Sequence, residues 1–110
     1  MSKKTILILF FLIALIGFVA AQTQKVACVG NSVTFGMGIE NPQERYPAQL
    51  QAILGNNYEV RNFGHSGATL LRKGHRPYNS LPEYSAALDF KPDIVIIHLG
   101  LNDTDPRNWP

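Results

Sequence analysis

The stretch Gly30–Gly36, with the sequence GNSVTFG, decides how the rest of the chain can fold. It follows a short apolar run, Val26–Val29, which is typical of a strand covered on both faces of a sheet. Within the stretch, Ser32 carries a hydroxyl, which becomes a good nucleophile once a base takes its proton. The sequence therefore predicts a glycine turn that presents a candidate nucleophile at the end of a buried strand.

Two later stretches repeat this arrangement. The segment Asn62–Thr69 (NFGHSGAT) follows the strand-like residues 58–63, and His98–Asp103 (HLGLND) comes at the end of the β-branched run 93–99. In open parallel sheets, ligands bind beyond the carboxyl ends of the strands. We therefore expect the three turns to form one site along one edge of a parallel sheet.

Two helices are expected between the three strands. The first begins at Tyr46-Pro47 and ends at Gly55 with a left-handed cap; its apolar face comprises Leu50, Ile53 and Leu54. The second begins at a capping box over Ser80–Glu83 and runs to about Phe90; its apolar face comprises Leu81, Tyr84 and Leu88.

The order β–α–β–α–β predicts an α/β fold, a partial doubly wound parallel sheet of the flavodoxin-like, three-layer α/β/α kind. The first strand is expected at residues 25–29. The second, 58–63, alternates only in part and is expected at or near an edge. The third, 93–99, is continuous and β-branched, and is expected at the centre with His98 packed or hydrogen-bonded.

The N-terminus reads as a secretory signal peptide over residues 1–21, with cleavage after Ala21. Lys3 and Lys4 precede an apolar run over residues 5–19, and small residues precede the polar segment that follows. The alternative is an uncleaved anchor, for which the run is short. We expect a secreted or periplasmic protein with no stable membrane anchoring, and at most one domain over residues 22–110.

Composition excludes several other classes of function. Apart from Lys3 and Lys4, the chain has 8 basic and 8 acidic residues, and no basic run suggests nucleic acid as a partner. The lone Cys28 lies within the first strand and is expected to be a small buried side chain. The three histidines of the chain lack metal-ligand spacing, so neither a metal nor another cofactor is expected. The first turn fits neither a P-loop, a dinucleotide fingerprint nor a G-x-S-x-G elbow.

The residue types at the three turns suit acyl transfer. Attack by Ser32 on an ester would place negative charge on the carbonyl oxygen, which needs preorganised donors about 3 Å away. The backbone N–H of Gly67 can approach closely because glycine has no side chain. The side-chain amide of Asn102 and the Ser32 N–H are the other candidate donors. Taken singly, each of the three residues is more typical of a turn or a helix cap.

Together the three stretches resemble the SGNH (GDSL-type) hydrolase family, in the family's order and over most of residues 22–110. The resemblance implies Ser32 as nucleophile, with Gly67 and Asn102 in the oxyanion hole. The segments 29–34, 67–69, 73–78 and 101–104 look most like secreted bacterial carbohydrate O-acetylesterases of the sialate O-acetylesterase-like kind. This implies a small-molecule or glycan ester as substrate; possible contacts with it are Asn31, His65, His75 and Arg76.

This sequence departs from the family pattern in two places. Asn31 stands where the family usually has aspartate, and there is no D-x-x-H block to supply the histidine base. No acidic partner for His65 is apparent. We therefore expect an N-terminal part of a longer esterase, which is poorly soluble and has no turnover alone. The alternatives are a lysophospholipase or thioesterase of the same family, or a non-catalytic carbohydrate-binding remnant.

Overall fold

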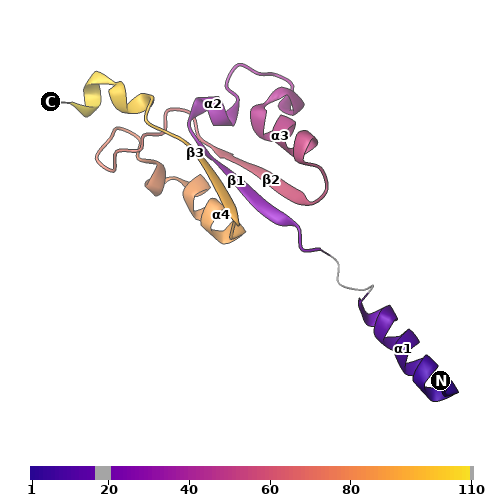
Figure 1. Ribbon diagram of the computed structural model, residues 1–110. Coiled ribbons are helices and arrows are strands. Elements are labelled where there is room, and N and C mark those ends of the chain that lie inside the picture. The colour runs from indigo at the N-terminus through magenta and orange to yellow at the C-terminus, as the bar shows by residue number, and fades with distance from the viewer. Residues whose placement is uncertain (17–20, 110) are drawn as a thin grey trace.

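The computed structural model describes residues 1–16 and 21–109 and has an α/β fold (Figure 1). Its helices and strands, in chain order, are α1 (Lys3–Ile16), β1 (Gln24–Gly30), α2 (Ser32–Phe35), α3 (Tyr46–Leu54), β2 (Tyr58–Gly64), α4 (Pro82–Phe90) and β3 (Ile94–His98). Single 3-10 turns lie at Pro42–Glu44, Tyr78–Ser80, Asn102–Thr104 and Pro106–Asn108.

The three strands form one parallel sheet in the order β2-β1-β3, so the predicted α/β class and strand direction are confirmed. The most buried strand, β1, lies in the middle, and β2 lies at an edge, as its partial alternation predicted. The central position of β1 places the turn after Gly30 between the turns that follow its two neighbours.

The two faces of the sheet carry different helices, with α4 on one side and α2 and α3 on the other (Figure 1). On the α4 face, side chains of β1 and β2 pack with those of the helix; this core includes Ala27, Val29, Phe63, Ala87 and Phe90. On the opposite face, Cys28 is fully buried, as expected for a small packed side chain, and burial raises the pKa of its thiol.

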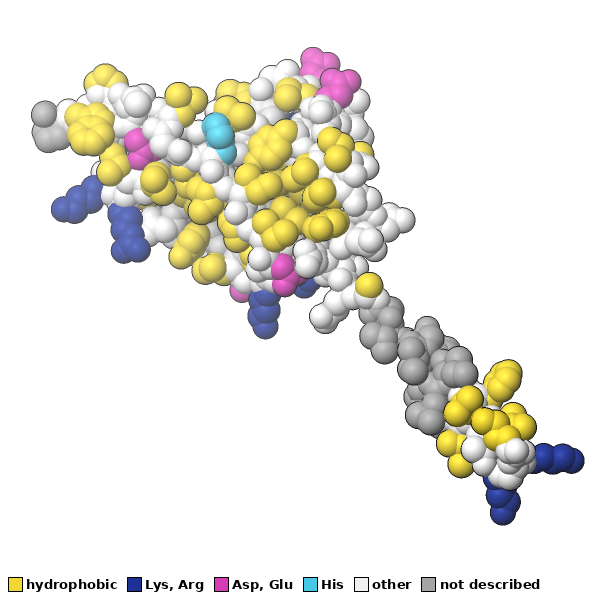
Figure 2. All heavy atoms as spheres, viewed as in Figure 1, with side chains coloured by type: hydrophobic (Ala, Val, Ile, Leu, Met, Phe, Trp, Pro, Cys, Tyr) yellow, Lys and Arg dark blue, Asp and Glu magenta, His cyan; other side chains and the backbone are white. Residues whose placement is uncertain are grey.

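The prediction of a central third strand is wrong for the described sheet, in which β3 lies at an edge. Its apolar residues 94–97 are 38–65% exposed, and His98 is also exposed rather than packed. Figure 2 shows hydrophobic side chains gathered over the side of the molecule on which β3 lies. The β-branched run has the composition of a doubly covered strand, but nothing among the described residues covers it.

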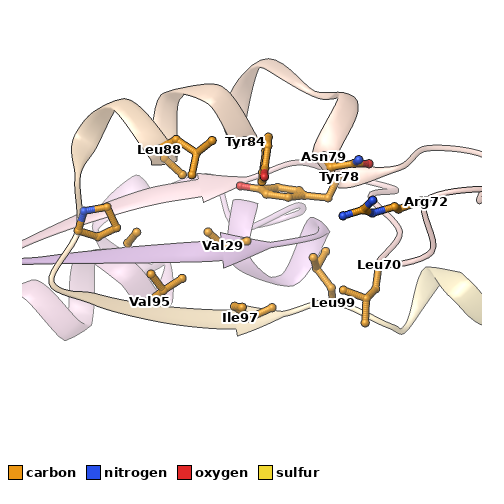
Figure 3. A pocket seen from close by; sticks show the side chains of 13 residues that line it. Val29, Leu70, Arg72, Tyr78, Asn79, Tyr84, Leu88, Val95, Ile97 and Leu99 are labelled. Atoms are coloured by element: carbon orange, nitrogen blue, oxygen red, sulfur yellow. The ribbon is translucent and has the colours of Figure 1, made fainter.

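An open groove of about 300 Å³ lies between α4 and β3 (Figure 3). Tyr84 and Leu88 reach into it from the helix, opposite Val95 and Ile97 from the strand. Tyr84 and Leu88 do share one face of α4, as predicted, but they are 39% and 59% exposed. The buried residues of α4 are instead Ala87 and Phe90.

Helix α3 begins at the predicted residue, but its apolar face is shifted. Ile53 is 80% exposed, whereas the neighbouring Gln51 is half-buried and faces β2. The Gln51 side chain accepts from Val60 N at 2.7 Å and donates to Tyr58 O at 2.9 Å. It therefore satisfies backbone groups of an edge strand. Gly55 has the expected positive φ of +74°, but its ψ of −164° is not left-handed helical.

The predicted signal segment contains α1, and none of the described helices is long and apolar enough to cross a membrane. The residues just before the predicted cleavage point, 17–20, lie outside the described part of the chain. Cleavage after Ala21 stays a prediction.

Substituting Gly64 should destabilise the fold, because a Cβ there would collide with the backbone of Thr34 and Phe35. We expect Gly64→Ala to lower the free energy of unfolding by about 3 kcal/mol, the cost of an overpacked site. Gly38→Ala is the control: Gly38 has a positive φ (+81°), which Gly64 lacks, but open space around it, so only backbone strain should lower the free energy of unfolding, by about 1 kcal/mol. Urea unfolding of both variants tests this. If the two variants lose the same free energy of unfolding, the close packing of α2 on β2 is contradicted.

Candidate active site

The three turns predicted to form one site start at the same level of the sheet. Gly30, the last residue of β1, is the register partner of Gly64 in β2 and of His98 in β3. Backbone hydrogen bonds continue the pairing beyond the strands: Asn31 N donates to His98 O at 3.2 Å, and His65 N donates to Gly30 O at 2.9 Å. The segments after the three strands therefore leave the sheet side by side.

Ser32 is the first residue of α2, a single turn of helix directly after β1. The turn is capped by Asn31, whose Oδ1 accepts from Val33 N at 3.0 Å. It is also held from β2, because Asn62 Nδ2 donates to Thr34 O at 2.8 Å. The half-buried Ser32 side chain is thus presented on a turn that is fixed from two sides.

Gly67 lies in the second turn with a φ of +83°, a conformation that favours glycine. A Cβ at this position would also lie 2.7 Å from Nη1 of Arg76, whose side chain crosses the turn. The same Nη1 donates to Ser66 O at 2.9 Å. The turn therefore favours glycine for its backbone conformation, and the Arg76 guanidinium packs directly against it.

Asn102 begins the 3-10 turn after β3 and reaches back to the second turn. Its Nδ2 donates to the carbonyl of Ala68, the residue after Gly67, at 3.0 Å. A side-chain amide nitrogen carries two hydrogens, so one is left for a further acceptor. The second and third turns are therefore in direct contact.

Asp103, the next residue, strengthens this contact. Its carboxylate accepts from Leu70 N at 2.9 Å and from Leu71 N at 2.6 Å. Its backbone carbonyl accepts from Trp109 Nε1 at 2.6 Å. Because the carboxylate is charged, its bonds to the two N–H groups are stronger than neutral ones, and Asp103 fixes the chain just after Gly67.

Asn108 joins the third turn to the basic loop that contains His75. Its Nδ2 donates to Asn102 O at 3.0 Å, and its Oδ1 accepts from His75 N at 2.7 Å. The ring Nδ1 of the exposed His75 lies 3.2 Å from the same Oδ1. The predicted substrate contact His75 is thus anchored through Asn108 to the segment that carries Asn102.

His65 has an acidic partner, contrary to the expectation from the sequence. Its Nδ1 lies 3.0 Å from Oε1 of Glu83, at the start of α4. The predicted capping box is therefore wrong: Leu81 is the N-cap residue, and Ser80 Oγ donates to Pro77 O. The pair ties the second turn to the helix on the face of the sheet opposite α2.

The pair also changes the titration of Glu83. Burial raises the pKa of the Glu83 carboxyl, but the hydrogen bond from His65, a hydrogen bond from its own backbone N–H and the charge of the imidazolium outweigh it. The net pKa lies below its usual value of 4.5.

Two buried polar atoms of the turns have no hydrogen-bond partner among the described residues: Asn31 Nδ2 and Ser66 Oγ. Asn31 is fully buried, so its side chain faces the turn, and its predicted contact with substrate stays a prediction. Unpaired buried polar groups are costly and uncommon in proteins. Both atoms lie in turns at this edge of the sheet, where an acceptor or donor from a ligand could reach them only if the turns open.

Sequence reasoning missed several residues that build the site, among them Glu83, Asp103, Asn108 and Tyr78. Tyr78 is buried and donates to Phe63 O at 2.6 Å; burial, and then the charge of Glu83, raise its pKa to about 12. These side chains bind backbone groups or partners distant in the sequence, so no local spacing reveals them. No group of three or more His, Cys, Asp or Glu within residues 1–16 and 21–109 could hold a metal ion.

Comparison with known proteins agrees with this arrangement. Residues 28–110 match the GDSL-like lipase/acylhydrolase family, a stretch that contains all three turns. The chain belongs to this family. The resemblance of the three sequence blocks is thereby confirmed, and with it the α/β fold.

One curated protein is similar to this chain over most of the chain's length. An acetylxylan esterase of Xylanibacter ruminicola is 54% identical over 86 residues, which are 77% of this chain and 18% of the relative. The chain thus spans about a fifth of the length of the curated relative that it matches.

The Glu83 pair should give the fold a pH-dependent stability. A carboxyl whose pKa is lowered on folding stabilises the fold above its unfolded pKa, and this contribution is lost as the pH falls through the lower, folded pKa. We expect Glu83→Gln to lower the free energy of unfolding by about 0.5–1 kcal/mol at pH 6. The substitution should have no effect once the pH is well below 4.5. Urea unfolding at both pH values tests this, with the exposed Glu40→Gln as control; a loss that is the same at both would contradict the ion pair.

Asp103 should protect the backbone amides that follow Gly67 from hydrogen exchange. Asp103→Ala leaves Leu70 N and Leu71 N without their acceptor, and we expect hydrogen exchange at these two amides to accelerate at least about tenfold, the equivalent of about 1.4 kcal/mol. Asp89→Ala, at an exposed position on α4, should leave them unchanged. Unaltered exchange in the Asp103 variant would contradict the proposed anchoring.

Proposed function

We propose that this chain carries the nucleophile and the oxyanion hole of a serine esterase that removes O-acetyl groups from carbohydrates. The observation that carries the proposal is the common register of the three strand ends, Gly30, Gly64 and His98. It brings the turns of Ser32, Gly67 and Asn102 to one edge of the sheet. Parallel sheets bind ligands at such an edge.

The reaction runs through an acetyl-enzyme. Ser32 Oγ attacks the acetyl carbonyl carbon, and the hydroxyl proton passes to a base. The resulting oxyanion accepts hydrogen bonds from the Ser32 and Gly67 N–H groups and from the free hydrogen on Asn102 Nδ2. When the intermediate collapses, the sugar oxygen leaves with the proton. Water, deprotonated by the same base, then attacks the acetyl carbon, releasing acetate and restoring Ser32.

The base in this scheme is a histidine supplied by sequence beyond these 110 residues, within a longer polypeptide. The histidines of this chain suit the role poorly. His65 pairs with Glu83 on the α4 face of the sheet, opposite the helix that carries Ser32, His98 is exposed at the sheet edge, and His75 lies on the basic loop. The exposed apolar residues of β3 and the groove beside α4 leave room for further strands and helices.

The substrate is proposed to be an O-acetylated carbohydrate. The similar protein from Xylanibacter ruminicola is named acetylxylan esterase, which favours an acetylated polysaccharide, whereas sialate specificity rests on the sequence resemblance alone. A glycan substrate also fits the proposed secretion of the protein by the N-terminal segment 1–21.

The test compares this chain with the product of the open reading frame that contains it. We expect the reading-frame product to hydrolyse p-nitrophenyl acetate and acetylated xylan, with activity falling as the acyl chain lengthens. Ser32→Ala should lower kcat/KM by at least about 10³-fold, as loss of a serine nucleophile does. Residues 22–110 alone should show no turnover.

The matched control is Ser85→Ala, at an exposed position on α4, which should leave kcat/KM within about twofold, as expected for surface changes. Full activity of the Ser32→Ala variant would exclude the nucleophile. A preference for long acyl chains would instead favour a lysophospholipase or thioesterase.

A further inference from the structure

The peptide unit between Ser66 and Gly67 has two polar groups, and the direction of one fixes the direction of the other. Its N–H belongs to Gly67, the proposed oxyanion donor, and its carbonyl belongs to Ser66. No cis peptide bond occurs in the described chain, and in a trans peptide the C=O and the N–H point in opposite directions. Whatever holds the Ser66 carbonyl therefore also sets the direction of the Gly67 N–H.

Arg76 holds this carbonyl. Its Nη1 donates to Ser66 O at 2.9 Å. The guanidinium also lies against Gly67, since a Cβ there would be 2.7 Å from Nη1 and 3.4 Å from Cζ. The contact is thus made at close range across a turn whose positive φ favours glycine.

The backbone of Arg76 is itself anchored to the second turn. Its carbonyl accepts from Thr69 N at 2.8 Å, and Tyr78 N donates to Thr69 O at 2.9 Å. Thr69 and Tyr78 are both buried. Because the base of the side chain is fixed, the guanidinium has a short and defined reach to the Ser66 carbonyl.

The charge of Arg76 is not neutralised by a carboxylate among the described residues. Two carboxylates of the site are engaged elsewhere: Glu83 with His65, and Asp103 with the N–H groups of Leu70 and Leu71. A cation bound to a carbonyl draws electrons from that peptide unit, and linked hydrogen bonds strengthen one another. The Gly67 N–H is thereby made a better donor.

We propose that Arg76 is a positioning residue of the oxyanion hole, which aims and polarises the Gly67 N–H through the Ser66 carbonyl. The proposal rests on the function proposed above. It replaces the simpler expectation that Arg76 contacts the substrate. Arginine suits this role better than lysine, because its planar, rigid fork keeps a fixed direction for the bond.

The kinetic test uses the product of the reading frame that contains this chain. We expect Arg76→Ala to lower kcat for p-nitrophenyl acetate about 10- to 100-fold, less than the loss of a whole oxyanion donor, with KM nearly unchanged. Arg76→Lys, which keeps the charge and one donor, should recover part of the loss. Lys73→Ala is the control: it removes another exposed cation from the same loop and should have no effect on kcat.

A structural readout keeps the proposal independent of catalysis. In ¹⁵N-labelled protein, Arg76→Ala should shift the Gly67 amide resonance and speed its hydrogen exchange, whereas Lys73→Ala should do neither. Urea unfolding shows whether each variant is folded; if Arg76→Ala is not, Arg76→Lys decides the question.

Three results would overturn the positioning role. They are an unchanged kcat with an unchanged KM, an unchanged kcat with a raised KM (which indicates a substrate contact), and an unmoved Gly67 amide. If Ser32→Ala retains activity, the proposed function fails, and the Gly67 amide still decides whether Arg76 orients this peptide.

Discussion

The structure depends on the register of three parallel strands, in which Gly30 pairs with Gly64 on one side and with His98 on the other. Backbone bonds from Asn31 to His98 and from His65 to Gly30 extend this pairing into the turns. A shift of one residue in either strand would turn its side chains to the opposite face. The same hydrogen bonds that join the strands into a sheet therefore also set the three turns beside one another.

Side chains that bind backbone groups then convert this neighbourhood into a defined site. Asn102 binds the Ala68 carbonyl, and Arg76 binds the Ser66 carbonyl. Asp103 binds the N–H groups of Leu70 and Leu71. The Ser66–Thr69 segment is thus held from the third turn and from its own returning loop. Preorganised donors of this kind stabilise a developing charge without rearrangement during the reaction, which is why the position of the peptide at Gly67 matters.

Much of the fold could be predicted from the sequence, because strand composition, proline and glycine act locally. The order of the three strands and of α3 and α4, the parallel sheet and the start of α3 follow from such signals. The edge position of β3 could not, since composition reports whether a strand suits burial but not what covers it. The His65–Glu83 pair was missed because Glu83 was assigned to a capping box, and the roles of Asp103 and Asn108 depend on partners 33 residues away. Ser32, Gly67 and Asn102 could be predicted as site residues from their sequence blocks, whereas the side chains that hold their turns in place follow only from the folded chain.

The most direct test of the account is the position of the oxyanion itself. A phosphonate ester that reacts with the reading-frame product should give a crystallographic adduct on Ser32 Oγ. We predict that one phosphonyl oxygen lies about 3 Å from the N–H of Gly67 and from Nδ2 of Asn102. An adduct on another residue, or an oxygen directed away from both donors, would contradict the claim that the three strand ends form one esterase site.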